Sequence, residues 1–142
     1  MTRNSNVIES FKDLVGNKNV ITNKWGKEPF ITGWRYGKGE ALAVVKPGTL
    51  LEMWQVLKVC VKNDVSVIMQ AANTGLTGGS TPFGNDYDRP VVIINTLRIT
   101  SIHLIKNAEQ IIALPGSSLY DLETKLKPLN KEPHSVIGST SI

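Results

Sequence analysis

The sequence is poor in cysteine and contains no long apolar run. Cys60 is the single cysteine among 142 residues, so the chain cannot form an intramolecular disulfide framework. No apolar stretch approaches the roughly 20 residues that a membrane-spanning helix needs. The N-terminal sequence MTRNSNVIESFKDLVG also lacks the apolar core of a signal peptide. These absences favour a protein of the cytoplasm.

Residue patterns that bind metals or nucleic acids are also missing. The two histidines, His103 and His134, lie far apart with no cysteine pair beside them, so we expect no metal site. Lys and Arg outnumber Asp and Glu by 16 to 12, but they are scattered and not interleaved with aromatic residues. We therefore expect no nucleic-acid partner. Asp86, Asp88 and Arg89 share one loop, where their spacing suits turn-forming side chains better than acid–base chemistry.

The hydrophobic pattern predicts a chain of mixed helices and strands. Helices are predicted at residues 5–16, 49–64 and 117–129. Strands are predicted at residues 41–47, 66–71, 90–95, 99–105 and 109–116, the last two paired with each other. Residues 17–40 are expected to be irregular. The strand, helix and strand from 41 to 71 form a predicted parallel crossover.

Two of the predicted helices begin at capping signals. Thr49 and Glu52 have capping-box spacing, as do Ser118 and Asp121. Cys60 is expected to be a buried, inert thiol. The residues expected on the buried face of the helix at 49–64 are Leu50, Met53, Trp54, Leu57 and Val61. The aromatic residues expected to anchor the irregular segment on the core are Trp25, Phe30, Trp34 and Tyr36.

A glycine-rich loop, QAANTGLTGGSTPFG at residues 70–84, follows the strand predicted at 66–71. Such bare, uncharged backbone suits a phosphate group, because successive N–H groups can converge on its oxygens. The loop lacks the lysine of a P-loop. A dinucleotide-binding fingerprint opens a helix, whereas this stretch runs into STPFGNDYDRP, whose prolines favour a continued loop. Judged by composition alone, a structural tight turn is an equally good interpretation.

The order of these segments resembles a known flavoprotein family. EALAVVKPGTLLEMWQVLKVC, MQAANTGLTGGSTPFGNDYDRPVVIINTLRI and KEPHSVIGSTSI stand in the order found in the FAD-binding domain shared by vanillyl-alcohol oxidase and p-cresol methylhydroxylase. Within that family the chain is similar to the bacterial quinone-dependent D-lactate dehydrogenases, over about residues 8–142. Gln70, Ala71 and Ala72 stand where many members of the family have an Arg followed by glycines, and the D-lactate branch shares this departure.

The resemblance implies an α+β fold, an FAD-binding domain of the p-cresol methylhydroxylase type with two small α/β subdomains. Residues 1–40 would form an N-terminal helix and irregular segment, and residues 41–142 an incomplete FAD-binding domain. The cofactor would be non-covalent FAD, because Thr74 occupies the place where some relatives attach flavin through a histidine. The residues implied to contact FAD are Ala71, Ala72, Asn73, Thr74, Gly75, Gly79, Ser80 and Gly138, with Pro115 and Gly116 as a further turn beside the cofactor. His134 would be structural or lie at the flavin edge.

The resemblance also implies an activity for the whole protein. It would oxidise D-lactate to pyruvate on the flavin and pass the electrons to a membrane quinone in respiratory electron transfer. The catalytic residues are expected after Ile142, so residues 1–142 alone would be inactive. Peripheral association with the cytoplasmic side of the inner membrane is expected through parts outside this segment.

Two alternatives remain open at this point. The substrate could be another D-2-hydroxy acid, such as glycolate or 2-hydroxyglutarate, because the residues that would select it are not in this sequence. The chain could also be a basic, non-enzymatic module that binds an anion. A flavin absorption band in the purified protein would separate the flavoproteins from the binding module.

Overall fold

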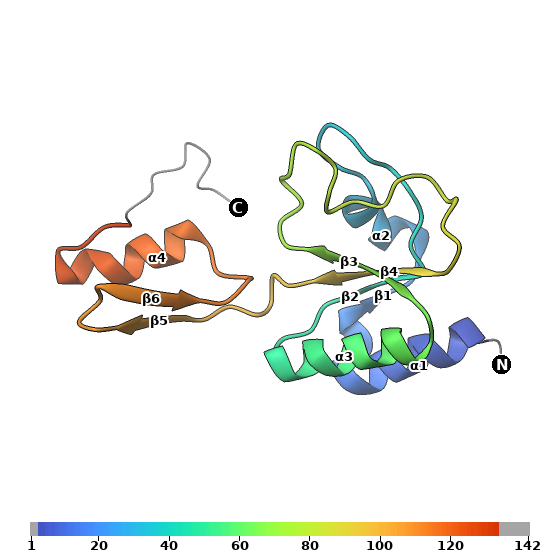
Figure 1. Ribbon diagram of the computed structural model, residues 1–142, viewed down its shortest axis with the longest axis horizontal. Coiled ribbons are helices and arrows are strands. Elements are labelled where there is room, and N and C mark those ends of the chain that lie inside the picture. The colour runs from blue at the N-terminus through green and yellow to red at the C-terminus, as the bar shows by residue number, and fades with distance from the viewer. Residues whose placement is uncertain (1–2, 134–142) are drawn as a thin grey trace. The chain divides into compact units, whose positions relative to one another are not determined.

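The computed structural model describes residues 3–133, and the chain divides into two compact units between Arg98 and Ile99 (Figure 1). Each unit is described by itself. Two residues singled out in the sequence, His134 and Gly138, lie outside the described residues.

Unit 1 is built on a four-stranded sheet. Its strands are β1 (Val20–Ile21), β2 (Ala43–Val45), β4 (Val91–Asn95) and β3 (Ser66–Gln70), in that spatial order. Strands β2 and β3 both run parallel to β4, and β1 is antiparallel to β2. The predicted parallel crossover from β2 to β3 is confirmed, with β4 inserted between the two strands.

Helices cover both faces of this sheet (Figure 1). Helices α1 (Arg3–Val15) and α3 (Leu50–Lys62) pack on one face, where Phe11, Val56 and Val92 are fully buried. Helix α2 (Lys24–Ile31) covers the opposite face, where Ile31 packs with Val44 and Ile93. All five residues of β4 are buried, as expected for a central parallel strand with both faces covered.

The start of α3 was predicted correctly, and its buried face was predicted in part. The Thr49 hydroxyl accepts a hydrogen bond from the Glu52 N–H at 3.0 Å, and the Glu52 carboxylate accepts one from the Gly48 N–H at 2.7 Å. Three residues predicted to be buried are instead exposed: Leu50 at 47%, Trp54 at 54% and Val61 at 81%. Met53 and Leu57 pack against the core and Cys60 is buried, as predicted, and Val56 is a fully buried residue that the prediction left out. Polar residues form one stripe of this helix, at Glu52, Gln55, Lys58 and Lys62, and apolar residues cover the rest of its surface. The apolar spacing alone therefore did not select which of these apolar residues face inward.

The segment predicted to be irregular contains α2, which begins at Asn23. The Asn23 side chain accepts a hydrogen bond from the Gly26 N–H at 2.7 Å and so caps the helix. The short 3-10 helix at Asn17–Asn19 and strand β1 precede it. Three aromatic residues predicted to anchor this segment are instead exposed: Trp25 at 86%, Trp34 at 77% and Tyr36 at 66%. Only Phe30 of that set packs against the core.

Unit 2 is a hairpin followed by a helix. Strands β5 (Ile102–Ile105) and β6 (Gln110–Ala113) pair antiparallel, as predicted, through a turn at residues 106–109. Helix α4 (Leu119–Leu126) begins at the predicted capping box, in which the Ser118 hydroxyl and the Asp121 carboxylate each accept from the other's backbone N–H. A 3-10 helix at Lys127–Leu129 follows α4.

Two valines on α3 test the corrected buried face. Val56 is fully buried and Val61 is 81% exposed, so the same substitution should have different effects at the two positions. Val56→Ala should lower the free energy of unfolding by about 2 kcal/mol, from lost burial and a residual cavity. Val61→Ala should change it by less than about 0.5 kcal/mol. Urea unfolding followed by tryptophan fluorescence measures both, and a larger loss at Val61 would contradict the corrected face.

Candidate functional site

The glycine-rich loop at residues 70–84 leaves the sheet at the carboxyl end of β3. Gln70, the last residue of β3, is paired in register with Asn95, the last residue of β4. Both side chains are buried, at 2% and 0% exposure. Ligands of parallel α/β sheets bind at this edge, beyond the carboxyl ends of the strands. The loop lies on the same side of the sheet as α2 (Figure 1).

The two buried amides at the strand ends hold the loop where it leaves the sheet. The Gln70 Nε2 group donates to the carbonyl oxygens of Phe30 and Ser80, each at 2.8 Å. The Asn95 Nδ2 group donates to the Ala71 carbonyl oxygen at 2.8 Å. Gln70 therefore ties α2 to the far side of the loop. In the sequence, Gln70 was noted only because it stands where many members of the family have an arginine, and Asn95 was not noted at all. The signal that could have identified both residues is a polar amide at the end of a buried apolar strand.

A third amide, that of Asn73, lies inside the loop. Its Nδ2 group donates to the Thr32 carbonyl oxygen at 3.0 Å and more weakly to that of Pro29 at 3.4 Å. Its Oδ1 atom accepts from the hydroxyl groups of Ser80 and Thr81, each at 3.0 Å. These bonds join the two limbs of the loop to each other, to α2 at Pro29 and to Thr32, which follows α2.

The tip of the loop offers backbone N–H groups. Among the described residues, those of 74–77 and 79–80 donate to no hydrogen-bond acceptor. Gly78 has φ +75°, a left-handed conformation that other residues rarely adopt. A Cβ atom added to Gly79 would meet nothing within 4 Å, and one added to Gly75 would meet only the Ser80 hydroxyl at 3.8 Å. These two glycines are thus not required by the packing of the loop itself.

The structure brings most of the predicted FAD-contacting residues together. Seven lie in this one loop: Ala71, Ala72, Asn73, Thr74, Gly75, Gly79 and Ser80. Pro115 and Gly116 form a turn in unit 2, closed by the Ser117 N–H donating to the Leu114 carbonyl oxygen at 2.9 Å. Their contacts with a cofactor stay a prediction, as do those of the loop.

Other candidates from the sequence lie elsewhere or are inert. Cys60 is buried, and burial raises the pKa of its thiol to about 11, so the predicted inert cysteine is confirmed. His103 is exposed on β5, as predicted, with its Nε2 atom 2.8 Å from the Ser101 hydroxyl. Within residues 3–133, no three His, Cys, Asp or Glu side chains gather where they could hold a metal ion. No helix of the described chain has the length and hydropathy needed to span a bilayer.

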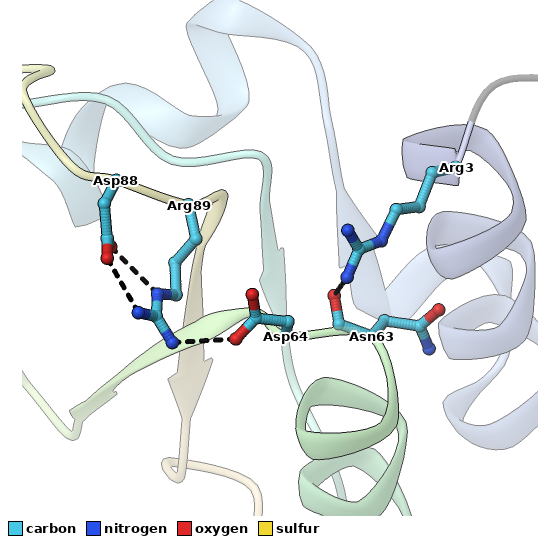
Figure 2. A network of polar contacts seen from close by, with 5 residues as sticks. All are labelled: Arg3, Asn63, Asp64, Asp88 and Arg89. Carbon is cyan, nitrogen blue, oxygen red and sulfur yellow. Dashed lines mark hydrogen bonds and ion pairs between the residues drawn. The ribbon is translucent and has the colours of Figure 1, made fainter.

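The charged residues Asp88 and Arg89 follow the glycine-rich loop and lie before β4, at the amino end of that strand. Arg89 precedes β4, and its guanidinium contacts the carboxylates of Asp88 and Asp64, each at 2.7 Å (Figure 2). Hydrogen bonding from Arg89 lowers the pKa of the Asp88 carboxyl below its ordinary value. Arg3 donates to the Asn63 carbonyl oxygen in the same network (Figure 2). Asp64 has φ +52°, so the network braces a turn before β3.

Comparison with known proteins identifies the family. A family model described as "FAD binding domain" matches residues 41–139. The chain belongs to this family of FAD-binding domains. FAD is therefore its cofactor, and the glycine loop and β2–β4 sheet fall within the matched residues.

Curated relatives extend over most of the chain. A quinone-dependent D-lactate dehydrogenase of Haemophilus influenzae is 60% identical over 136 residues, which are 96% of this chain and 24% of that protein. One of Escherichia coli is 54% identical over 141 residues, 99% of this chain and 25% of that protein. A mitochondrial D-2-hydroxyglutarate dehydrogenase of Arabidopsis thaliana is 32% identical over 63% of this chain and 16% of that protein. The chain spans about a quarter of the length of the first two relatives.

Solved structures confirm the predicted fold class. Substrate-bound p-cresol methylhydroxylase matches 90% of this chain and 25% of its own at a TM-score of 0.72 and 16% sequence identity. Alkyldihydroxyacetonephosphate synthase matches 88% of this chain and 25% of its own at a TM-score of 0.76, also with 16% identity. The chain therefore has the α+β fold of FAD-binding domains of the p-cresol methylhydroxylase type. The domain division predicted between residues 40 and 41 stays a prediction.

The Arg89 network predicts a pH effect. Arg89→Gln removes the guanidinium, so the pKa of Asp88 should rise toward the ordinary value of about 3.9. Because the folded pKa is lowered, the pair stabilises the protein above the unfolded pKa, and this contribution is lost as pH falls through the folded pKa. NMR titration of the Asp88 carboxyl carbon measures the shift. Lys38→Gln is the matched control, since Lys38 lowers the pKa of Glu28 and should leave Asp88 unchanged. An unaltered Asp88 titration in Arg89→Gln would contradict the assignment.

Proposed function

We propose that the chain is the FAD-binding part of a flavoprotein dehydrogenase that oxidises D-lactate to pyruvate and transfers the electrons to a quinone. The observation that carries the proposal is an uncharged glycine loop whose tip offers backbone N–H groups, in a chain 60% identical to a protein named quinone-dependent D-lactate dehydrogenase. That relative is matched over 96% of this chain.

The loop suits the FAD pyrophosphate in charge and in its free backbone N–H groups. Its N–H groups at 74–77 and 79–80 present partial positive charge and donate to no acceptor within the described chain. Residues 70–84 contain no carboxylate that would repel phosphate and no cation that would attract it. Binding therefore relies on backbone dipoles, with the Thr74 and Thr77 hydroxyls as additional donors. Bound FAD supplies the redox chemistry by accepting a hydride, and the protein holds and orients it.

FAD is proposed to be held without a covalent bond. Thr74, in the loop, offers no imidazole or thiol for attachment. Cys60 lies on the buried face of α3, and burial raises the pKa of its thiol to about 11, which leaves it protonated at neutral pH. Acid denaturation followed by filtration should release the flavin from the polypeptide.

The remaining parts of the activity are proposed from the relatives. The catalytic and substrate-binding residues are proposed to lie in the portion of the relatives' length that this chain does not span. The surface that associates with the cytoplasmic side of the inner membrane, where the quinone would be reduced, is proposed to lie in that portion too. A second candidate substrate is D-2-hydroxyglutarate, because a protein named for it is 32% identical over 63% of this chain.

Two glycines report directly on cofactor contact. Gly75→Val and Gly79→Val should leave folding intact, since an added Cβ meets little or nothing at either position. Each branched side chain should nevertheless occupy the space of the pyrophosphate and weaken FAD binding by more than about 100-fold, a loss of roughly 2.7 kcal/mol. Flavin fluorescence titration of the complete polypeptide measures the affinity, with Gly79→Ala as a graded step of smaller effect. Circular dichroism checks the fold. Wild-type flavin stoichiometry in both valine variants would contradict the proposed contact between the loop and the pyrophosphate.

The substrate is tested by steady-state kinetics of the complete polypeptide with a soluble quinone. We expect kcat/KM for D-lactate to exceed those for L-lactate, glycolate and D-2-hydroxyglutarate. Residues 1–142 alone, supplied with FAD, should give no turnover above a protein-free control. A kcat/KM for D-2-hydroxyglutarate above that for D-lactate would contradict D-lactate as the substrate. Turnover by residues 1–142 alone would show that the catalytic residues lie within them.

A further inference from the structure

Asn73 makes more of the glycine loop's hydrogen bonds than any other side chain in it. Its backbone is left-handed, with φ +58°, in a residue that is not glycine. Asparagine tolerates this conformation better than most residues, which allows the chain to turn sharply after β3. The side chain makes the four bonds described above, two to the second limb of the loop, one to Pro29 in α2 and one to Thr32 after that helix.

The chemistry of its partners fixes the orientation of this amide. The carbonyl oxygens of Pro29 and Thr32 can only accept, so the atom facing them must be the donor Nδ2. The hydroxyls of Ser80 and Thr81 face Oδ1 and can donate to it. Each hydroxyl has one proton, so donating to Asn73 removes the Ser80 hydroxyl as a donor to a ligand. Ser80 then contributes its backbone N–H.

The loop depends on hydrogen bonds from outside it because the backbone of its tip makes few hydrogen bonds within the chain. Within the described chain, residues 74–77 donate no backbone N–H to a protein acceptor. The support comes from a segment that ends before the family match begins at Ala41. That segment also bonds the loop through Gly84, whose N–H donates to the Lys38 carbonyl oxygen at 2.9 Å and whose carbonyl oxygen accepts from the Glu40 N–H at 3.0 Å.

We propose that Asn73 is a positioning residue that holds the glycine loop in its FAD-binding shape by tying it to Pro29 and Thr32. This inference rests on the proposed function and deepens it: the N-terminal segment outside the matched domain helps to build the cofactor site. A loop fixed in its bound conformation avoids the entropy cost of ordering when the ligand binds. Loss of the amide should therefore weaken FAD binding while the sheet remains folded.

The test uses the complete polypeptide and separates the backbone from the amide. Asn73→Gly removes the four hydrogen bonds but keeps the left-handed backbone conformation accessible. Asn73→Ala removes the four hydrogen bonds and also disfavours that backbone conformation. Asn63→Ala is the matched control. The Asn63 amide also donates to a backbone carbonyl oxygen, that of Val59 at 2.8 Å, but Asn63 precedes β3 and lies outside the glycine-rich loop. Thr81→Val removes one hydroxyl donor at nearly constant volume. The readouts are the FAD dissociation constant, the thermal midpoint, and amide hydrogen exchange of residues 71–81 without FAD.

Asn73→Gly should raise the FAD dissociation constant by about 10- to 100-fold, as expected for losing a few hydrogen bonds, with Asn73→Ala at least as weak. Exchange at residues 71–81 should accelerate in both, while the thermal midpoint of Asn73→Gly stays close to that of Asn63→Ala. Thr81→Val should weaken binding less, and adding it to Asn73→Gly should have little further effect because both act through one network.

Wild-type FAD affinity and wild-type loop exchange in Asn73→Gly would overturn the inference. Normal affinity in Asn73→Gly with weak binding in Asn73→Ala would assign the role to the backbone conformation and overturn the role of the amide. If the wild-type polypeptide itself binds no FAD, the proposed function fails. The exchange of the empty loop then decides whether Asn73 orders it.

Discussion

A loop that offers its backbone N–H groups to an anion cannot use the same groups to hold its own shape. In this chain the tip at residues 74–80 is supported by side-chain amides placed around it, those of Gln70, Asn73 and Asn95. Gln70 and Asn95 end two adjacent parallel strands, so the sheet register sets the distance between them. The fold places these amides together at one edge of the sheet, at the carboxyl ends of β3 and β4.

The rest of unit 1 keeps that edge fixed. Strand β4 is buried along its whole length between β2 and β3, and apolar layers on both faces resist any shift in register. Helix α2 forms the layer on the loop's side and brings the carbonyl of Phe30 to Gln70. The first 40 residues thus act on the loop through α2 and the segment after it, although they precede the matched family region.

Much of this fold could be predicted from the sequence because its signals are local. The strands at β3 and β4 are short apolar runs bounded by turn residues, and the capping pair Ser118 and Asp121 lies within one helical turn. Helix α2 was missed because its eight residues include Gly26 and Pro29, which usually interrupt helices. The buried face of α3 was predicted only in part, because its contacts with α1 and the sheet select which apolar residues face inward. The Asn73 network joins residues 41 positions apart, and no local pattern reports such a contact.

The central claim is that the backbone N–H groups of residues 74–80 bind the pyrophosphate of FAD. Amide hydrogen exchange of the complete polypeptide, compared between saturating FAD and saturating riboflavin, tests it most directly, because riboflavin has the same ring system without phosphate. The account predicts slower exchange at residues 74–80 with FAD and no change there with riboflavin. Tight FAD binding that leaves the exchange of residues 74–80 unchanged, with protection confined to other segments, would contradict it.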